Sequence, residues 1–162
     1  MIPRFIILHH SATSRDRTTF AAVNNYHYAL GYGGCGYHYF ITADGKITQA
    51  RKDNEVGCHC IADGMNQKSI GICLAGNFMT EYPTPAQLEA LRGILSEKAR
   101  GFNIPLANIL GHREVKNSAT LCCGDNLVKW LKDYKNTDLN SIQIQLNKIA
   151  EIIKALFKKV GI

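Results

Sequence analysis

Apolar residues along this chain gather in short runs that predict β-strands. Residues 5–9, 37–42 and 69–75 are each rich in β-branched or aromatic side chains, which favour a pleated and largely buried backbone. Asp44-Gly45 follows the second run and predicts a tight hairpin into a further strand at residues 46–50. These runs supply the core strands of a sheet.

Two other segments carry apolar residues at helical spacing. Residues 20–30 have this spacing at Phe20, Val23, His27 and Leu30, and Gly31 then ends the run as a C-cap would. Thr84-Pro85-Ala86-Gln87 supplies a capping hydroxyl, a proline at the first helical position and a glutamine at the third. One face of the helix that follows is predicted to carry Leu88, Leu91, Leu95 and Ala99. Because strands alternate with helices, the sequence predicts an α/β fold with a mixed central β-sheet flanked by helices.

The end of the chain has an apolar pattern of its own. Residues 135–138 predict a short linker with a helix N-cap, after a domain that spans residues 1–134. Residues 139–162 then predict an extra C-terminal amphipathic helix with apolar positions three and four residues apart, at Leu139, Ile142, Leu146, Ile149, Ile153, Leu156 and Val160. Its polar side carries four lysines (148, 154, 158 and 159) against Glu151. Such a stripe can lie on an anionic membrane, drive self-association or fold back on its own domain.

Length and charge narrow the possible partners. A chain of 162 residues suits one domain with a substantial core. The formal net charge of +6 predicts an acidic partner, such as anionic lipid or the bacterial wall. Nucleic acid is not expected, because dense Lys/Arg runs with interleaved aromatics are missing. No secretory signal is visible and no apolar run approaches the ~20 residues that cross a bilayer. We therefore expect cytoplasmic synthesis.

Two histidines and a cysteine are candidates for metal chemistry. His9 closes the first apolar run, His112 follows Leu110-Gly111, and Cys122 lies ten residues after His112. Two His and one Cys can hold Zn²⁺ and leave a fourth position open for water, which is the layout of a catalytic zinc site. The spacing alone forms no compact zinc motif.

Six cysteines are many for a cytosolic chain of this size; they lie at positions 35, 58, 60, 73, 122 and 123. We expect reduced and partly buried thiols, since cysteine packs as a small apolar residue. A second metal site at Cys58-His59-Cys60 and a disulfide elsewhere are alternatives.

Six blocks occur in one order along the chain: Leu8-His9-His10-Ser11-Ala12-Thr13, Gly36-Tyr37-His38-Tyr39-Phe40-Ile41, Asn66-Gln67-Lys68-Ser69-Ile70-Gly71-Ile72, Thr84-Pro85-Ala86-Gln87, Gly111-His112-Arg113-Glu114-Val115 and Thr120-Leu121-Cys122-Cys123-Gly124. In this order they resemble the zinc N-acetylmuramoyl-L-alanine amidases, which include the amidase-type phage lysozymes and the peptidoglycan recognition proteins. The resemblance covers roughly residues 4–134. It implies zinc-dependent cleavage of the amide that joins the lactyl group of muramic acid to L-alanine in peptidoglycan.

The resemblance also implies roles for single residues. His9, His112 and Cys122 match the three zinc ligands, whereas Cys123 takes the place of a family proline and adds a competing thiol. His10 should point to the opposite face of its strand, packed or exposed. Zinc lowers the pKa of a bound water to about 7, which supplies hydroxide at neutral pH.

Further residues of the implied site surround those ligands. Tyr37 matches the family's catalytic tyrosine, and Thr120 falls where relatives carry Lys or Thr; both hydroxyls can donate to an oxyanion. His59 and Asn66 match positions at the substrate groove, with structural roles as the alternative. Glu114 is either a support for a zinc ligand or a solvated charge. His27 and His38 are expected to be packed or to support the ligands.

The leading functional hypothesis is an autonomous peptidoglycan hydrolase of the endolysin or autolysin type, which reaches the cell wall after release. A cytosolic amidase that recycles muropeptides is a second hypothesis, and the missing signal suits it equally. A non-catalytic peptidoglycan-binding module is the third. Modules of that kind typically lose a zinc ligand, and this chain keeps all three.

Overall fold

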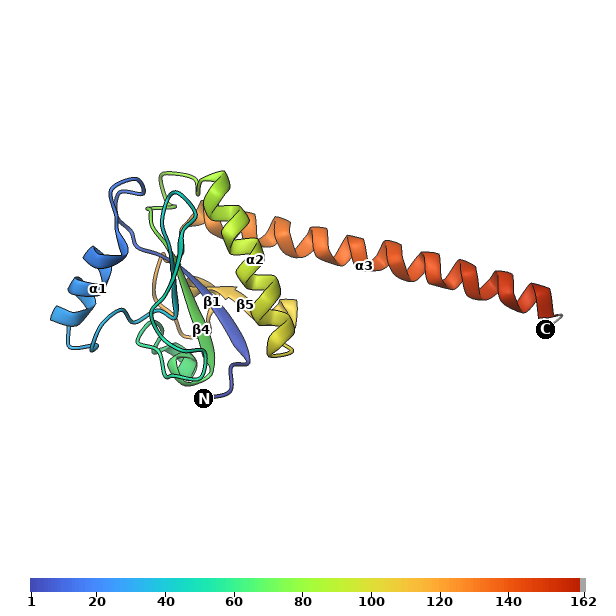
Figure 1. The fold of residues 1–162 in the computed structure, drawn as a ribbon, viewed down its shortest axis with the longest axis horizontal. Helices are drawn as coiled ribbons and strands as arrows, with labels where there is room; N and C mark the ends of the chain where they lie inside the picture. The colour runs from blue at the N-terminus through green and yellow to red at the C-terminus, as the bar shows by residue number, and fades with distance from the viewer. Residues whose placement is uncertain (161–162) are drawn as a thin grey trace. The chain divides into compact units, whose positions relative to one another are not determined.

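A computed structural model describes residues 1–160, without the side chains of residues 138–142, 154–155 and 157–160 (Figure 1). The chain divides into two units, Met1–Val128 and Lys129–Ile162. The strands are β1 (Phe5–His10), β2 (Tyr39–Ile41), β3 (Ile47–Gln49), β4 (Ser69–Leu74) and β5 (Ile109–Gly111). The helices are α1 (Phe20–Ala29), α2 (Pro85–Gly101) and α3 (Asp125–Val160), with short 3₁₀ turns η1 (Ala62–Gln67), η2 (Leu106–Asn108) and η3 (His112–Glu114).

The five strands form one mixed sheet in the order β3-β2-β4-β1-β5. β1 pairs in parallel with β4 and β5, and β4 also pairs in parallel with β2. β3 runs antiparallel to β2 across the predicted hairpin, where the Gly45 N–H donates to the Thr42 carbonyl at 2.9 Å. The predicted fold class is confirmed. β5 was not predicted, because its three residues are too few to establish a strand pattern.

Helix α2 covers one face of the sheet, opposite α1 (Figure 1). Its predicted start is confirmed: the Thr84 hydroxyl accepts from the Gln87 N–H, and the Gln87 side chain accepts from the Thr84 N–H. Leu91 and Leu95 are fully buried as expected, whereas Ile94 and Gln87 take the remaining core positions instead of Leu88 and Ala99. The Gln87 amide donates to the Ala75 carbonyl at 2.8 Å, which satisfies this buried polar group.

Helix α1 lies on the other face. Val23 joins a buried cluster with Cys35, Phe40 and Cys73. The helix ends at Ala29 with Leu30 as its C-cap, within two residues of the predicted end. α1 therefore covers the part of the sheet next to the carboxyl end of β1.

Helix α3 differs from the prediction at its start. It begins at Asp125 and is continuous through residues 135–138, so the expected linker is helical and no new helix begins there. This stretch contains neither Pro nor Gly, and the Thr137 hydroxyl donates to the Asp133 carbonyl one turn earlier, which is compatible with a continuous helix.

The predicted amphipathic pattern is present in the described part of α3. Six apolar side chains are between 46% and 60% exposed: Ile144, Leu146, Ile149, Ile152, Ile153 and Leu156. The side chains of Leu139, Ile142 and Val160 lie outside the described residues. In the described part of the chain, no helix combines the length and the apolarity needed to cross a membrane.

Candidate metal centre and substrate cleft

The register of the central strands brings His9 and His112 together. Leu8 of β1 pairs with Gly111 of β5, so the residues that follow them lie side by side at the carboxyl ends of the two strands: His9, still within β1, and His112, the first residue after β5. Their ring centroids are 4.6 Å apart. His112 lies on η3, whose turn is held by the Glu114 carboxylate as it accepts from the Gly111 N–H at 2.8 Å. Glu114 therefore supports a predicted ligand.

Cys122 reaches the same edge on a loop that is tied down at three points. The Arg113 N–H donates to the Cys122 carbonyl at 2.6 Å, and the His10 N–H donates to the Cys122 sulfur at 3.5 Å. Gly124 has φ +87°, and a Cβ there would lie 2.4 Å from the Phe78 backbone carbon. Only glycine allows the loop to approach Phe78 this closely.

These three side chains form the one group of potential metal ligands found among the described residues. The ligand atoms of His9, His112 and Cys122 all lie within 4.8 Å of one another. The His9 Nδ1 is 3.6 Å from the Cys122 Sγ. Tetrahedral zinc with Zn–N of about 2.1 Å and Zn–S of about 2.3 Å separates two such ligands by about 3.6 Å. The donor set and its spacing thus fit zinc.

The protonation states of the three groups follow from their burial. Burial lowers the pKa of His9 well below its usual value and also lowers the pKa of His112, so both imidazoles are neutral at pH 7. Burial raises the pKa of the Cys122 thiol to about 11. A metal ion that binds here must therefore displace the thiol proton.

Cys123 and the other cysteines lie outside this group. Cys123 is fully buried, and the sulfur that lies with the two imidazoles is that of Cys122. All six cysteines are free thiols, so the alternative of a disulfide is not realised. Cys58, His59 and Cys60 form no second metal-ligating group in the part of the chain that is described.

Two predicted catalytic hydroxyls lie next to the three ligands. The Tyr37 ring is 5.0 Å from the His9 ring, and burial raises the pKa of Tyr37 well above its usual value, with the Cys73 and Cys122 thiols adding to the effect. Tyr37 therefore keeps its proton. The Thr120 hydroxyl accepts from the Cys122 N–H at 3.1 Å, which leaves its own proton free to donate.

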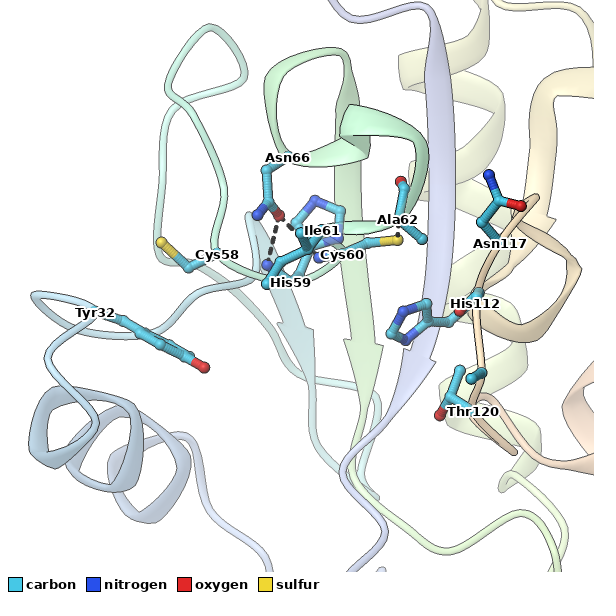
Figure 2. Close-up of a pocket in the computed structure, with 12 residues that line it drawn as sticks. Tyr32, Cys58, His59, Cys60, Ile61, Ala62, Asn66, His112, Asn117 and Thr120 are labelled. Carbon is cyan, nitrogen blue, oxygen red and sulfur yellow. Dashed lines mark hydrogen bonds between the residues drawn. The ribbon is translucent and has the colours of Figure 1, made fainter.

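Two hollows flank these groups. The larger, of about 620 Å³, has His112 and Thr120 on one side and His59 and Asn66 on the other (Figure 2). A second, of about 430 Å³, is lined by Tyr37 together with residues of α1 and of the loop after β1. One hollow therefore adjoins the candidate ligand His112, and the other adjoins Tyr37.

The two predicted groove residues line the larger hollow, yet both make contacts within the protein. The Asn66 Oδ1 accepts from the backbone N–H groups of His59 and Cys60, each at 2.8 Å. His59 is 8% exposed, and its Nδ1 is 3.0 Å from the His9 Nε2. Burial lowers the pKa of His59 to about 3, with the nearby His38 adding to the effect.

The remaining histidines near the cleft are held by hydrogen bonds. His10 is packed on the opposite face, as expected, and its Nδ1 accepts from the Phe78 N–H at 3.1 Å. The His38 Nδ1 accepts from the Gly71 N–H at 3.0 Å, and the His27 Nδ1 accepts from the Gly36 N–H at 2.9 Å. Each of these three rings thus satisfies one backbone N–H group.

Sequence reasoning missed the role of Arg113, which binds the loop that carries Cys122. Besides its backbone bond to Cys122, its guanidinium donates to the Leu121 carbonyl and pairs with Asp125. The residue follows His112 directly, which is the one signal that could have drawn attention to it.

Comparisons with known proteins agree with this geometry. Residues 1–125 match the family described as N-acetylmuramoyl-L-alanine amidase. The endolysin of Enterobacteria phage K11 is 34% identical over 115 residues, which cover 68% of this chain and 72% of the endolysin. Peptidoglycan-recognition protein SC2 of Drosophila simulans is 34% identical over 140 residues, which cover 82% of this chain and 74% of that protein. The solved structure of the N-acetylmuramoyl-L-alanine amidase LysC from Clostridium intestinale superposes with a TM-score of 0.73 at 32% identity and covers 83% of this chain and 86% of LysC.

Proposed function

Because the chain belongs to the N-acetylmuramoyl-L-alanine amidase family, we propose that it hydrolyses the amide between N-acetylmuramic acid and L-alanine in peptidoglycan with the help of one zinc ion. The observation that carries the proposal is the convergence of the ligand atoms of His9, His112 and Cys122 within 4.8 Å, beside a hollow of about 620 Å³ that His112 lines. The net charge of +6 suits an acidic wall polymer.

His9, His112 and Cys122 would hold the zinc, and the bound ion would lower the pKa of a water molecule to about 7 and polarise the scissile carbonyl. Tyr37 keeps its proton and can donate a hydrogen bond to the oxygen on which negative charge develops. Thr120 offers a second hydroxyl, next to Cys122. Thr120 brings no positive charge, so we expect its loss to matter less than that of Tyr37. His59 and Asn66 line the hollow in which the substrate would lie.

The other two hypotheses are a non-catalytic binding module and a recycling amidase. A non-catalytic binding module needs no complete ligand set, whereas all three donors converge here. A recycling amidase would prefer soluble muropeptides, while an endolysin or autolysin acts on intact wall after release. The similarity to a phage endolysin favours the wall-degrading role. Comparing rates on intact sacculi and on soluble muropeptides separates the two.

We also propose that residues 139–160 contact an anionic membrane surface. The exposed apolar residues of α3 can enter the acyl boundary, and four lysines against Glu151 complement anionic headgroups. The same charge imbalance disfavours pairing between copies, because like charges would then be neighbours. The matched family region ends before this segment, at residue 125. We propose that residues 1–134 form the catalytic domain.

Zinc content tests the ligand set. The wild-type chain should bind one zinc ion, Cys122→Ser should lose most of it, and Cys123→Ser should keep it, because only the Cys122 sulfur lies with the two imidazoles. Metal analysis after dialysis measures this, with thermal melts as a control for folding. Metal that follows Cys123 would contradict the assignment.

The products identify the bond. Digestion of purified sacculi should release peptides with a new L-alanine N-terminus, leave the glycan strands intact and stop when a chelator removes zinc. Mass analysis and a reducing-sugar assay read both outcomes. New reducing ends would show that a glycosidic bond is cut instead.

The Tyr37 hydroxyl should be needed for turnover and not for metal binding. Tyr37→Phe should lower kcat by about 10²-fold, the effect of removing one donor to an oxyanion, while zinc content stays at one per chain. Tyr28→Phe is the matched control, since Tyr28 lies on the exposed side of α1. A Tyr37→Phe rate close to that of wild type would exclude Tyr37 from the reaction.

The membrane proposal is tested in the full chain and in a chain that ends at Asn136. The full chain should co-sediment with phosphatidylglycerol vesicles and not with phosphatidylcholine vesicles, and Ile149→Ser/Ile153→Ser should weaken this binding. The shortened chain should lose binding but keep its activity on purified sacculi. A full chain that ignores anionic vesicles and sediments as a dimer would favour self-association.

A further inference from the structure

The two ring nitrogens of His9 face different partners. The Nδ1 is 3.6 Å from the Cys122 sulfur, on the side of the candidate metal position, and the Nε2 is 3.0 Å from the His59 Nδ1. His9 is 1% exposed and His59 is 8% exposed, so water cannot readily replace either contact.

This arrangement selects one tautomer of His9. A neutral imidazole has one N–H and one lone pair. If the His9 Nδ1 offers its lone pair to a metal, its proton must be on Nε2, and Nε2–H then donates to the His59 Nδ1. His59 in turn must carry its proton on Nε2. That nitrogen is buried and has no hydrogen-bond partner among the described residues.

The His59 ring lies in a space that two glycines leave open. Gly71 pairs with Ile7 on the same face of the sheet as His9, and a Cβ on Gly71 would lie 2.6 Å from the His59 ring. A Cβ on Gly57 would lie 2.5 Å from the same ring. Gly71 in β4 and Gly57 in the loop before His59 therefore leave the space that the ring occupies, and a side chain at either position would collide with the ring.

The backbone of His59 is fixed by the side chain of Asn66. The Asn66 Oδ1 accepts from the N–H groups of His59 and Cys60, which anchors the segment that carries the ring (Figure 2). The position of the His59 ring therefore depends on Asn66.

We propose that His59 is a positioning residue that holds His9 as its Nε2–H tautomer and aims its Nδ1 at the metal, and that Gly57, Gly71 and Asn66 hold His59 for this purpose. The inference rests on the proposed zinc site and assigns His59 a role other than contact with substrate. Partners that orient a ligating histidine typically change metal affinity by 10- to 100-fold when they are removed.

Zinc affinity of the full chain tests the proposal, measured by competition with a chromophoric chelator. His59→Leu removes the acceptor and should raise the zinc Kd by about 10- to 100-fold. His59→Asn places an amide oxygen near the position of Nδ1 and should restore most of the affinity. His27→Leu removes a buried histidine outside the metal group and should leave the zinc Kd unchanged.

Imidazole ¹⁵N chemical shifts of wild-type protein give a readout that does not depend on any variant folding. The proposal expects His9 protonated at Nε2 and bound to zinc through Nδ1. Zinc bound through Nε2, or a wild-type zinc Kd in folded His59→Leu, would overturn it. If the wild-type chain binds no zinc at all, the proposed metal site itself is wrong, so the two failures are distinguishable.

Discussion

The parallel pairing of β1 with β4 and β5 is the constraint on which the candidate site depends. The register sets Leu8 opposite Gly111, so that His9, near the end of β1, and His112, just after β5, lie side by side. Because side chains alternate along a strand, a slip of one residue would turn His9 to the other face and bring His10 to the site. His10 is instead fixed to the Phe78 N–H on the far side, which makes the observed register the one that satisfies both rings.

Burial sets the protonation states of the groups in the site, and it also makes hydrogen bonds necessary for the buried polar groups around them. It keeps the His9 and His112 rings neutral and the Tyr37 hydroxyl protonated, as a metal ligand and a hydrogen-bond donor require. The same burial would penalise unpaired polar groups. The neighbouring rings of His10, His27 and His38 meet this demand by each accepting a backbone N–H.

Features set by neighbours in sequence were predictable, and features set by distant contacts were not. The cap at Thr84, the hairpin at Asp44-Gly45 and the strands follow from local patterns, and the ligand set was implied by the family resemblance. The short strand β5 depends on its pairing with β1. The contact between His9 and His59 depends on a loop that folds over Gly71, and no spacing in the sequence encodes it. The helix through residues 135–138 was missed because polar residues without Pro or Gly suit a linker and a helix alike.

A crystal structure of the zinc-loaded protein, with anomalous diffraction measured on both sides of the zinc edge, tests the account most directly. It should place one zinc ion at the His9 Nδ1, a ring nitrogen of His112 and the Cys122 sulfur, with the His9 Nε2 still within hydrogen-bonding distance of His59. A peak that involves Cys123 or His59 as a ligand, or one away from this edge of the sheet, would contradict the account.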